Sequence, residues 1–405
     1  MGERVIVLGA TVPATVRAFL AGQAHFVSEH GWQVHVVTSP GVELAGIRRD
    51  LEGSHGVLVH EIPMVRNPSP VKDLLALTAW VRLLRKIKPQ VVMVGTPKAG
   101  LLGMLSSRLL GTQHRVYLVR GLRLEGLRGL PAAISALTER VTCSAATDVV
   151  CVSKSLERAM LQRRLVSPEK VQVLGQGSSN GVDVGRFRPP SAAERFAARR
   201  VFDIDEDAVV VGFAGRLTQD KGVEDLLAAI AIVHADYPGV RLLIAGEVDV
   251  GVVLPEASKG DLGDSRIVFA GGVDNMVNFY SALDVFCLPS HREGLPNVNL
   301  EASACGLPVV TTSATGCIDS VVSGRTGIAV PPHDPMALSR SLSMLIVDPE
   351  KRKLLGREGR AWVERTFRQE SVWAQQLRFL NALVPDGDGH RDSAGAATPL
   401  SDHER

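Results

Sequence analysis

Residues 284–310 read DVFCLPSHREGLPNVNLEASACGLPVV, which is an apolar run, a polar turn and two further apolar segments. The first run, 284–290, has the length and the apolar character of a buried strand. Pro296 suits the first turn of a helix and disfavours a helical conformation at Leu295, so a helix should begin there. The run 307–313 is again strand-like. Strand, helix and strand in succession indicate a parallel sheet covered by helices.

The same alternation continues in both directions along the chain. Between the strand-like runs lie segments with apolar residues at three- and four-residue steps, such as 71–88. The alternation of strands and helices is interrupted at 175–190, a segment rich in Gly, Ser, Asn and Pro that is typical of a linker. The other strand-like runs are 4–9, 33–39, 57–62, 91–95, 115–119, 148–152 and 171–175 before the linker, and 208–215, 240–246, 266–271 and 326–331 after it.

The sequence therefore predicts an α/β protein with two doubly wound domains, which 405 residues can accommodate. We expect a first domain over 1–188 and a second over 189–366. Helices are expected near 349–363 and 369–383, and the segment 367–384 should pack back toward the first domain. The polar tail 385–405 is expected to be disordered.

Composition excludes several classes of protein. Hydrophobic residues make up 45% and charged residues 22%, an ordinary globular balance. Met1–Arg4 leads directly into a strand, so no secretory signal is expected. The longest apolar stretch, 91–111, is interrupted by Pro97 and Lys98 and does not read as a membrane span. The five cysteines lack C-x-x-C spacing and are expected to be buried thiols in a reducing cytoplasm.

The charge is unevenly distributed. Residues 1–190 hold 24 Lys and Arg against 13 Asp and Glu, a net charge of +11. Residues 191–405 hold 21 against 30, a net charge of −9. This asymmetry predicts that the first half meets something anionic, although a chance surface bias accounts for it equally well.

Two glutamates in the opening stretch are candidates for ligand contacts. Glu293 falls on the loop after a strand, and Glu301 falls in the second turn of the following helix. Between them, the amides near Asn297 and Val298 form a helix N-terminus, which attracts phosphate. Carboxylates beside a phosphate are tolerated where they accept hydrogen bonds from hydroxyl groups. A molecule with a central diphosphate and a polyol at each end fits this arrangement, as a nucleotide sugar does.

A second motif, GFAGRLTQDKG (212–222), favours the same ligand. It places Arg216 and Lys221 directly after the first strand of the second domain. Open α/β sheets bind ligands at this carboxyl edge. Two cations beside a helix N-terminus can hold a diphosphate without a metal ion.

These residues resemble the retaining glycosyltransferases of family 4, which have the two-domain GT-B fold. The motifs that carry the resemblance are GRLTQDKG, AGEVD (245–249), FAGGVDN (269–275), LPSHREGLPNVNLEASACGLPVV (288–310) and DSVVSGRTGIAVPPHDP (319–335). The linker SSNGVDVGRFRP also fits, and the match is most specific from 212 to 335. The first-half stretches 11–23 and 115–129 look like the subgroup that builds bacterial capsules and other surface polysaccharides.

The resemblance implies roles for particular residues. Arg216 and Lys221 would hold the donor diphosphate, Glu293 with the amides of Gly294 and Leu295 would touch the donor sugar, and Glu301 would hold the ribose. The loop at Gly272 and Val273 would pass the base. The implied donor site therefore comprises Gly215, Arg216, Lys221, Gly272, Val273, Glu293, Gly294, Leu295, Asn297 and Glu301, and the implied acceptor side comprises Gly9, Thr11 and Arg120.

One position departs from the family pattern. Many members carry a His after a first-domain strand, near the reacting sugar carbon, whereas VYLVRG places Arg120 there. An arginine cannot act as a base at neutral pH. It could steady the leaving phosphate or an acceptor phosphate. The resemblance implies a front-side displacement in which the leaving phosphate takes the acceptor proton, so no protein base is required.

The expected function is transfer of a sugar from a nucleoside diphosphate to an acceptor hydroxyl, at a site between the domains. Glu293, Arg216, Lys221 and Arg120 are the expected catalytic residues. The acceptor is expected to be a saccharide or lipid-linked saccharide, without metal, cofactor or nucleic acid. Basic amphipathic segments at 80–88 and 156–166 suggest peripheral attachment to an anionic membrane on its cytoplasmic side, although their apolar residues could equally pack on the sheet.

Three alternative functions are considered. A nicotinamide-dependent dehydrogenase needs G-x-G-x-x-G after the first strand and an acidic residue after the second, and this chain has LGATVPAT and Thr38-Ser39-Pro40 instead. A nucleotide-sugar epimerase of the same fold would make a new sugar nucleotide without an acceptor. A non-catalytic sensor would bind the donor without turnover.

Overall fold

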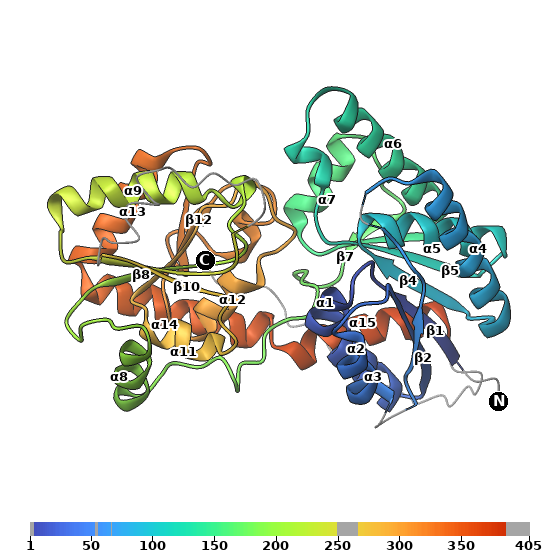
Figure 1. Ribbon diagram of the computed structural model, residues 1–405, viewed down its shortest axis with the longest axis horizontal. Helices are drawn as coiled ribbons and strands as arrows, with labels where there is room; N and C mark the ends of the chain where they lie inside the picture. The colour runs from blue at the N-terminus through green and yellow to red at the C-terminus, as the bar shows by residue number, and fades with distance from the viewer. Residues whose placement is uncertain (1–3, 53–55, 66, 249–265, 386–405) are drawn as a thin grey trace, which may run out of the picture.

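The chain folds into two halves, each built around a parallel sheet (Figure 1). The computed structural model describes residues 4–52, 56–65, 67–248 and 266–385. Within those residues the strands form one seven-stranded and one six-stranded sheet. All strand pairings within them are parallel. The predicted fold of two doubly wound α/β domains is confirmed.

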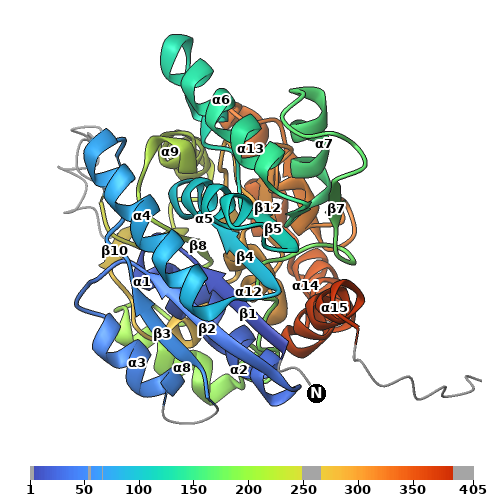
Figure 2. The ribbon, with the colours of Figure 1, turned by 90° about the vertical axis from the view of Figure 1, so that its right-hand side faces the viewer.

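The first sheet has the strand order β3-β2-β1-β4-β5-β6-β7. Helices α4, α5 and α6 pack in a row, whereas α2 and α3 pack together on the other face (Figure 2). The strands are β1 (Arg4–Gly9), β2 (Trp32–Thr38), β3 (Leu58–Glu61), β4 (Val91–Gly95), β5 (His114–Val119), β6 (Asp148–Cys151) and β7 (Val171–Val173). The helices are α1 (Pro13–Thr15), the π-helix η1 (Val16–Leu20), α2 (Ala21–Glu29), α3 (Leu44–Glu52), α4 (Pro70–Ile87), α5 (Pro97–Leu109), the 3₁₀-helix η2 (Arg123–Gly126), α6 (Gly129–Ala145) and α7 (Lys154–Gln162).

The second sheet has the strand order β10-β9-β8-β11-β12-β13. The order reverses between β8 and β11, and ligands of open α/β sheets bind at such a switch point. The strands are β8 (Val210–Ala214), β9 (Arg241–Ala245), β10 (Ile267–Gly271), β11 (Val285–Leu288), β12 (Val309–Thr312) and β13 (Gly327–Val330). The helices are α8 (Ala192–Val201), η3 (Gln219–Lys221), α9 (Val223–Asp236), α11 (Met276–Ala282), α12 (Asn297–Ala304), η5 (Ile318–Ser320), α13 (Pro335–Val347), α14 (Pro349–Thr366) and α15 (Gln369–Leu383).

The chain crosses between the two halves twice, and the two crossings lie side by side. Val182, in the linker, exchanges backbone hydrogen bonds with Phe367 and Gln369, at 2.8 and 3.0 Å. Beyond this point α15 runs against the first half (Figure 1). There the indole of Trp373 donates to Asn180, and the indole of Trp32 donates to Asn381.

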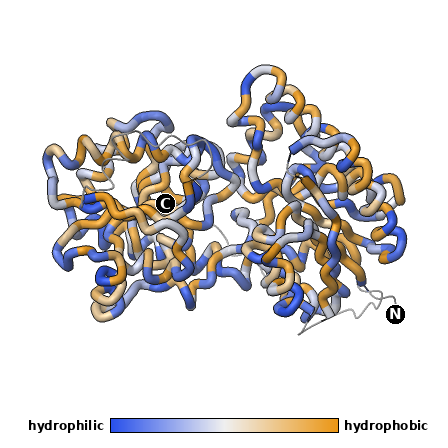
Figure 3. The backbone as a smooth tube through the Cα atoms, in the orientation of Figure 1, coloured by the Kyte–Doolittle hydropathy of each residue, from blue (hydrophilic) through white to orange (hydrophobic). Residues whose placement is uncertain are grey.

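The predicted elements agree closely with the observed ones. Hydrophobic segments are concentrated in the strands of both sheets (Figure 3). The strand predicted to end at Ser290 ends at Leu288, because Pro289 has no N–H to donate to the sheet. All five cysteines are buried free thiols, as expected. Residues 386–405, most of the predicted tail, lie outside the described residues.

Candidate functional site

The loop after β8 carries the two predicted cations. Gly215 has a φ of +152°, and its carbonyl oxygen would lie only 1.9 Å from a Cβ atom on Gly246. Arg216 follows and is exposed. Lys221 ends η3, and Gly222, with a φ of +68°, leads into α9. Both cations therefore lie on one loop at the switch point of the second sheet.

Glu293 lies on the loop between β11 and α12, on the other side of the switch point. Its carboxylate accepts a hydrogen bond from Ser290 Oγ at 2.9 Å and forms an ion pair with Lys221. Its backbone N–H donates to the Thr315 carbonyl at 2.8 Å. The side chains of Lys221 and Glu293 are only 22% and 14% exposed. Lys221 was predicted to hold the donor diphosphate and Glu293 to touch the donor sugar, and in the structure the two side chains contact each other.

Glu301 lies on the second turn of α12, as predicted. Its carboxylate accepts a hydrogen bond from the Tyr280 hydroxyl at 2.8 Å. Burial raises the pKa of Glu301 above its ordinary value. Asn297 opens the helix, and its Oδ1 is buried without a hydrogen-bond partner among the described residues. The N-terminus of α12 therefore separates two shielded carboxylates.

The remaining predicted donor residues differ in their surroundings. Gly294 is buried, and a Cβ atom there would lie 2.1 Å from the carbonyl oxygen of Arg120, so this close approach requires glycine. Leu295 is also buried. Gly272 is exposed and Val273 is half-buried, on the loop after β10. That loop follows β10, which lies two strands away from β8 and three from β11, the strand that precedes Glu293.

The predicted acceptor residues follow strands of the first sheet. Gly9 ends β1 in the core, where a Cβ atom would lie 2.6 Å from Val94, so packing accounts for this glycine. The Thr11 hydroxyl lies 2.7 Å from that of Thr96, which precedes α5. Arg120 follows β5, and its guanidinium lies over the Phe19 ring at 5.7 Å.

Direct contacts join the two halves beside these residues. Ser153 Oγ donates to the Gly294 carbonyl at 2.6 Å. The Ser155 backbone N–H donates to the Asp319 carboxylate at 3.1 Å, and Ser155 Oγ accepts from Gly316 N–H at 2.7 Å. The carboxyl ends of β5 and β6 therefore face those of β11 and β12, which brings the neighbourhoods of Arg120 and Glu293 together.

A histidine and carboxylate cluster lies beside the loop of Glu293. His291 Nε2 lies 2.7 Å from the Asp225 carboxylate, and the His291 ring packs against that of His333 in a tilted arrangement, with centroids 3.7 Å apart. The polar atoms of the three side chains all lie within 4.8 Å of one another. The sequence motifs gave no reason to group these residues, because they come from three separate segments.

This arrangement is suited to binding a diphosphate that carries hydroxyl-rich groups at both ends. Two cations and a helix N-terminus offer positive charge without a metal ion. The carboxylates can accept hydrogen bonds from hydroxyl groups. Sequence reasoning missed Tyr280 and Ser290, the partners of these carboxylates. The only available signal for Tyr280 was its place in an apolar helix, where a hydroxyl needs a partner.

Comparison with protein families gives two matches that together span most of the chain. Residues 19–186 match the model described as Glycosyltransferase Family 4. Residues 194–362 match the model described as Glycosyl transferases group 1. The boundary between the matches falls within the linker region.

Among individual relatives, the chain is 33% identical over 371 residues to the capsular polysaccharide biosynthesis glycosyltransferase CapM of Staphylococcus aureus. This match covers 91% of the chain and 95% of the relative. A D-inositol 3-phosphate glycosyltransferase of Segniliparus rotundus is 31% identical over 287 residues, which is 69% of this chain and 62% of that one.

Solved structures share the fold at lower sequence identity. Sucrose-phosphate synthase from Thermosynechococcus elongatus has a TM-score of 0.76 at 21% identity, covering 94% of this chain and 99% of that chain. Anabaena Alr3699/HepE in complex with UDP-glucose has a TM-score of 0.74 at 20% identity, covering 93% and 99%. These neighbours show that the two-domain arrangement is the GT-B fold.

Proposed function

This chain belongs to glycosyltransferase family 4, and from that premise we propose that it moves a hexose or hexose derivative from a nucleoside diphosphate to an acceptor hydroxyl with retention of configuration. The observation that carries the proposal is the ion pair of Lys221 with Glu293 at the switch point of the second sheet. The pair brings the cation that we propose to bind phosphate next to the carboxylate that we propose to bind sugar hydroxyls.

The donor would lie across the carboxyl edge of the second sheet. Lys221 and Arg216 would bind its diphosphate, Glu293 its sugar hydroxyls and Glu301 its ribose. The Anabaena protein, which has the same fold, was solved with UDP and with UDP-glucose. That observation supports a nucleotide-sugar donor in general and leaves the base and the sugar open.

The proposed step is a displacement on one face of the sugar. The bond from the anomeric carbon to the phosphate oxygen breaks as the bond to the acceptor oxygen forms. The leaving phosphate oxygen receives the acceptor proton, so no side chain needs to act as a base. The contacts between the halves would help to exclude water, which would otherwise hydrolyse the donor.

The acceptor would be a growing saccharide of a surface polysaccharide, carried on a lipid. The similarity to CapM over 91% of the chain supports a role in polysaccharide synthesis. No helix among the described residues is both long and apolar enough to cross a bilayer. Access to a lipid-linked acceptor would therefore depend on the surface of the enzyme.

The segments predicted to lie on a membrane do not offer the apolar surface that their sequences suggested. In 80–88, Trp80 and Leu84 are buried against the sheet. In 156–166, Leu156, Met160 and Leu165 are buried as well. The helical spacing of these apolar residues places them in the core, so we do not propose that either segment lies on the membrane as an amphipathic helix.

Another surface of the first half does offer exposed apolar side chains. On α6, Leu130, Ile134 and Leu137 are 73%, 52% and 60% exposed, and Arg128 and Arg140 flank them. This face of α6, defined by the three apolar residues, has the composition of a helix that enters the interface of an anionic membrane. Helix α6 stands at the top of the first half in Figure 2.

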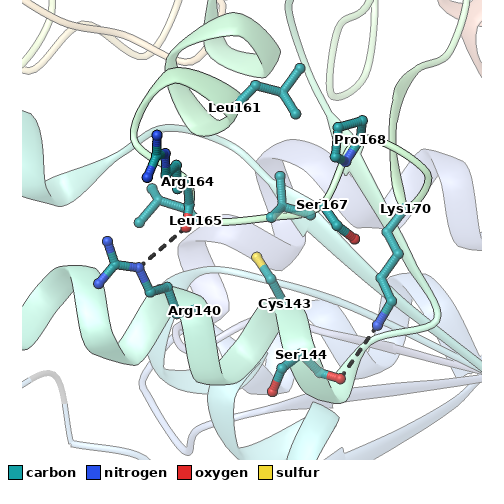
Figure 4. A pocket seen from close by; sticks show the side chains of 10 residues that line it. Arg140, Cys143, Ser144, Leu161, Arg164, Leu165, Ser167, Pro168 and Lys170 are labelled. Atoms are coloured by element: carbon teal, nitrogen blue, oxygen red, sulfur yellow. Dashed lines mark hydrogen bonds between the residues drawn. The ribbon is translucent and has the colours of Figure 1, made fainter.

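A groove beside the C-terminal part of α6 adds basic groups to this surface (Figure 4). Its volume is about 690 Å³, and its walls include the apolar side chains of Leu161 and Leu165. Arg140, Arg164 and Lys170 also line it. Apolar walls with basic groups suit an anionic lipid, which supports attachment through the first half.

A screen of nucleotide sugars tests the proposed function. We expect one donor to raise the melting temperature, because a ligand stabilises the folded state in proportion to its occupancy. That donor, with a lipid-linked saccharide, should then give a glycosylated product with retained configuration. A new sugar nucleotide formed without acceptor would indicate an epimerase, and binding without any turnover would indicate a sensor.

A further inference from the structure

Arg120 carries a buried charge that none of the described residues pairs by a hydrogen bond. Its Nε, Nη1 and Nη2 atoms are all shielded from solvent, and no described residue forms a hydrogen bond with them. Burial lowers the pKa of Arg120 to about 10, so the guanidinium still carries its charge at neutral pH. A buried charge without a hydrogen-bonding counterion is strongly unfavourable, and native proteins rarely retain one.

Arg199 shows how this chain treats a buried arginine that has a structural role. It is 1% exposed, and its guanidinium forms an ion pair with Asp284 at 2.8 Å. It also donates to the carbonyl oxygens of Asp205 and Glu206. The contrast favours a partner for Arg120 that lies outside the described residues.

The groups around Arg120 hold its side chain in place without neutralising it. On one side, a Cβ atom on Gly95 would lie 2.3 Å from Nη1, so the guanidinium packs directly against the backbone at the end of β4. On the other side lies the ring of Phe19, at 5.7 Å. Phe19 belongs to the π-helix η1, and such helices occur frequently at functional sites.

The backbone places Arg120 at the meeting point of the two halves. Its carbonyl oxygen lies against Gly294, the neighbour of Glu293. A Cβ atom on Gly121 would lie 3.6 Å from the Gly294 nitrogen. Arg120 therefore belongs to the first sheet but borders the loop that is proposed to hold the donor sugar.

We infer that Arg120 binds a phosphate group of a substrate in the proposed transfer reaction. The planar guanidinium can donate two parallel hydrogen bonds to phosphate oxygens, which would satisfy the nitrogens that are now unpaired. Because these nitrogens are shielded in this structure, the groups that cover them have to shift for a phosphate to reach them. This inference rests on the proposed function for the identity of the substrates.

The phosphate could come from either of two substrates. One source is the phosphate that leaves the donor, where Arg120 would stabilise charge that develops during transfer. The other is a phosphate of the acceptor, where Arg120 would orient the acceptor from the first half. In both cases Arg120 binds a phosphate group. The two cases differ in the kinetic effect that is expected when Arg120 is replaced.

The decisive variant is Arg120→Met, which removes the charge and keeps an unbranched side chain. We expect kcat/KM to fall by ~10² or more, the effect typical of one charged contact to the transition state. We also expect the melting temperature of the ligand-free protein to stay the same or rise, because an unpaired buried charge is removed. Arg199→Met is the matched control, and it should lower the melting temperature because it removes a buried ion pair with Asp284 and leaves the carbonyl oxygens of Asp205 and Glu206 without this donor.

Kinetics separate the two sources. If the phosphate belongs to the donor, Arg120→Met should slow the hydrolysis of donor in the absence of acceptor. If it belongs to the acceptor, that hydrolysis should be unchanged and the KM for a phosphate-bearing acceptor should rise. In the second case, an acceptor analogue without phosphate should react equally slowly with both proteins.

A binding measurement keeps this inference separate from the proposed function. In a thermal-shift titration with inorganic pyrophosphate, Arg120→Met should raise the apparent Kd at least ~10-fold. If the wild-type chain transfers no sugar from any donor, the proposed function fails and the pyrophosphate titration alone decides the role of Arg120. With an active wild-type enzyme, kcat/KM of Arg120→Met within threefold of the wild-type value would overturn the inference, as would a lowered melting temperature equal to that of Arg199→Met.

Discussion

Lys221 and Glu293 form an ion pair across the switch point of the second sheet, although 72 residues separate them in the chain. The pair neutralises a cation and a carboxylate that are both largely shielded from water. A diphosphate that binds Lys221 would compete with Glu293 for its ammonium group. Glu293 would then be free to accept hydrogen bonds from sugar hydroxyls, so donor binding and carboxylate release are coupled by this contact.

We predict that Glu293→Ala lowers turnover by ~10² or more while the fold is kept. The expected loss corresponds to one strong contact that forms in the transition state. Steady-state kinetics of the variant, with circular dichroism to verify folding, measure it. Glu206→Ala, which removes an exposed carboxylate far from the site, should behave as wild type. Near-normal turnover of a folded Glu293→Ala enzyme would remove Glu293 from the reaction.

The sequence alone predicted most of the fold, because buried parallel strands and amphipathic helices leave strong local patterns. The strand over 4–9 and the helix over 369–383 are both observed where they were expected. Local motifs also placed Lys221 and Glu293 at strand ends. Their proximity to each other follows from the strand order, which brings β8 next to β11.

Contacts that depend on the relative position of distant segments could not be predicted. Ser155 contacts Asp319 across the two halves, and although Asp319 opens one of the recognised motifs, nothing in the sequence pairs it with Ser155. Tyr280 meets Glu301 because α11 and α12 are neighbours in space. The lack of a partner for Arg120 is likewise visible only when its surroundings are known.

We predict that transfer activity persists in excess chelator. Arg216 and Lys221 are proposed to supply the charge that a divalent ion supplies in other enzymes. The group formed by Asp225, His291 and His333 is the place in the described structure where an ion could act instead. The activity of the wild type should therefore be the same with and without EDTA. The activity of His333→Ala should also be unaffected by EDTA. Loss of activity that magnesium or manganese restores would contradict the roles of Arg216 and Lys221.

We predict that Glu139 makes the protein less stable as the pH rises from about 5 to 7. Glu139 is buried and accepts a hydrogen bond from the Tyr117 hydroxyl at 3.0 Å. Burial raises the pKa of Glu139 from 4.5 to about 7 in the folded state. Between these values the folded chain holds a proton that the unfolded chain has lost, so the free energy of unfolding falls as the pH rises.

Glu139→Gln tests this prediction, because the amide is neutral at every pH and can still accept from Tyr117. Relative to wild type, the variant should gain stability as the pH rises, up to roughly 3 kcal/mol at pH 8. Urea unfolding at several pH values between 5 and 8 measures the difference. Glu206→Gln is the exposed control and should leave the pH profile unchanged. Parallel profiles for wild type and Glu139→Gln would show that Glu139 titrates normally.

We predict that the protein binds vesicles of anionic lipid through the exposed apolar face of α6. Leu130, Ile134 and Leu137 would enter the interface, and burial of one such side chain contributes ~1.5–3 kcal/mol. Each arginine near the surface, such as Arg128 and Arg140, adds about 1 kcal/mol. Co-sedimentation should therefore show binding to anionic vesicles that weakens as salt rises, and little binding to neutral vesicles.

Replacing all three apolar residues of α6 with glutamine should abolish this binding, since the two arginines that remain contribute only about 1 kcal/mol each. The matched control replaces three exposed apolar residues of the second half, Val201, Val347 and Leu354, with glutamine. That control should still bind, because its substitutions lie far from α6 and remove a similar amount of apolar surface. Equal recovery of the wild type in the supernatant with neutral and anionic vesicles at low salt would disprove the attachment. Loss of binding in the control alone would move the contact to the second half, away from the proposed acceptor side.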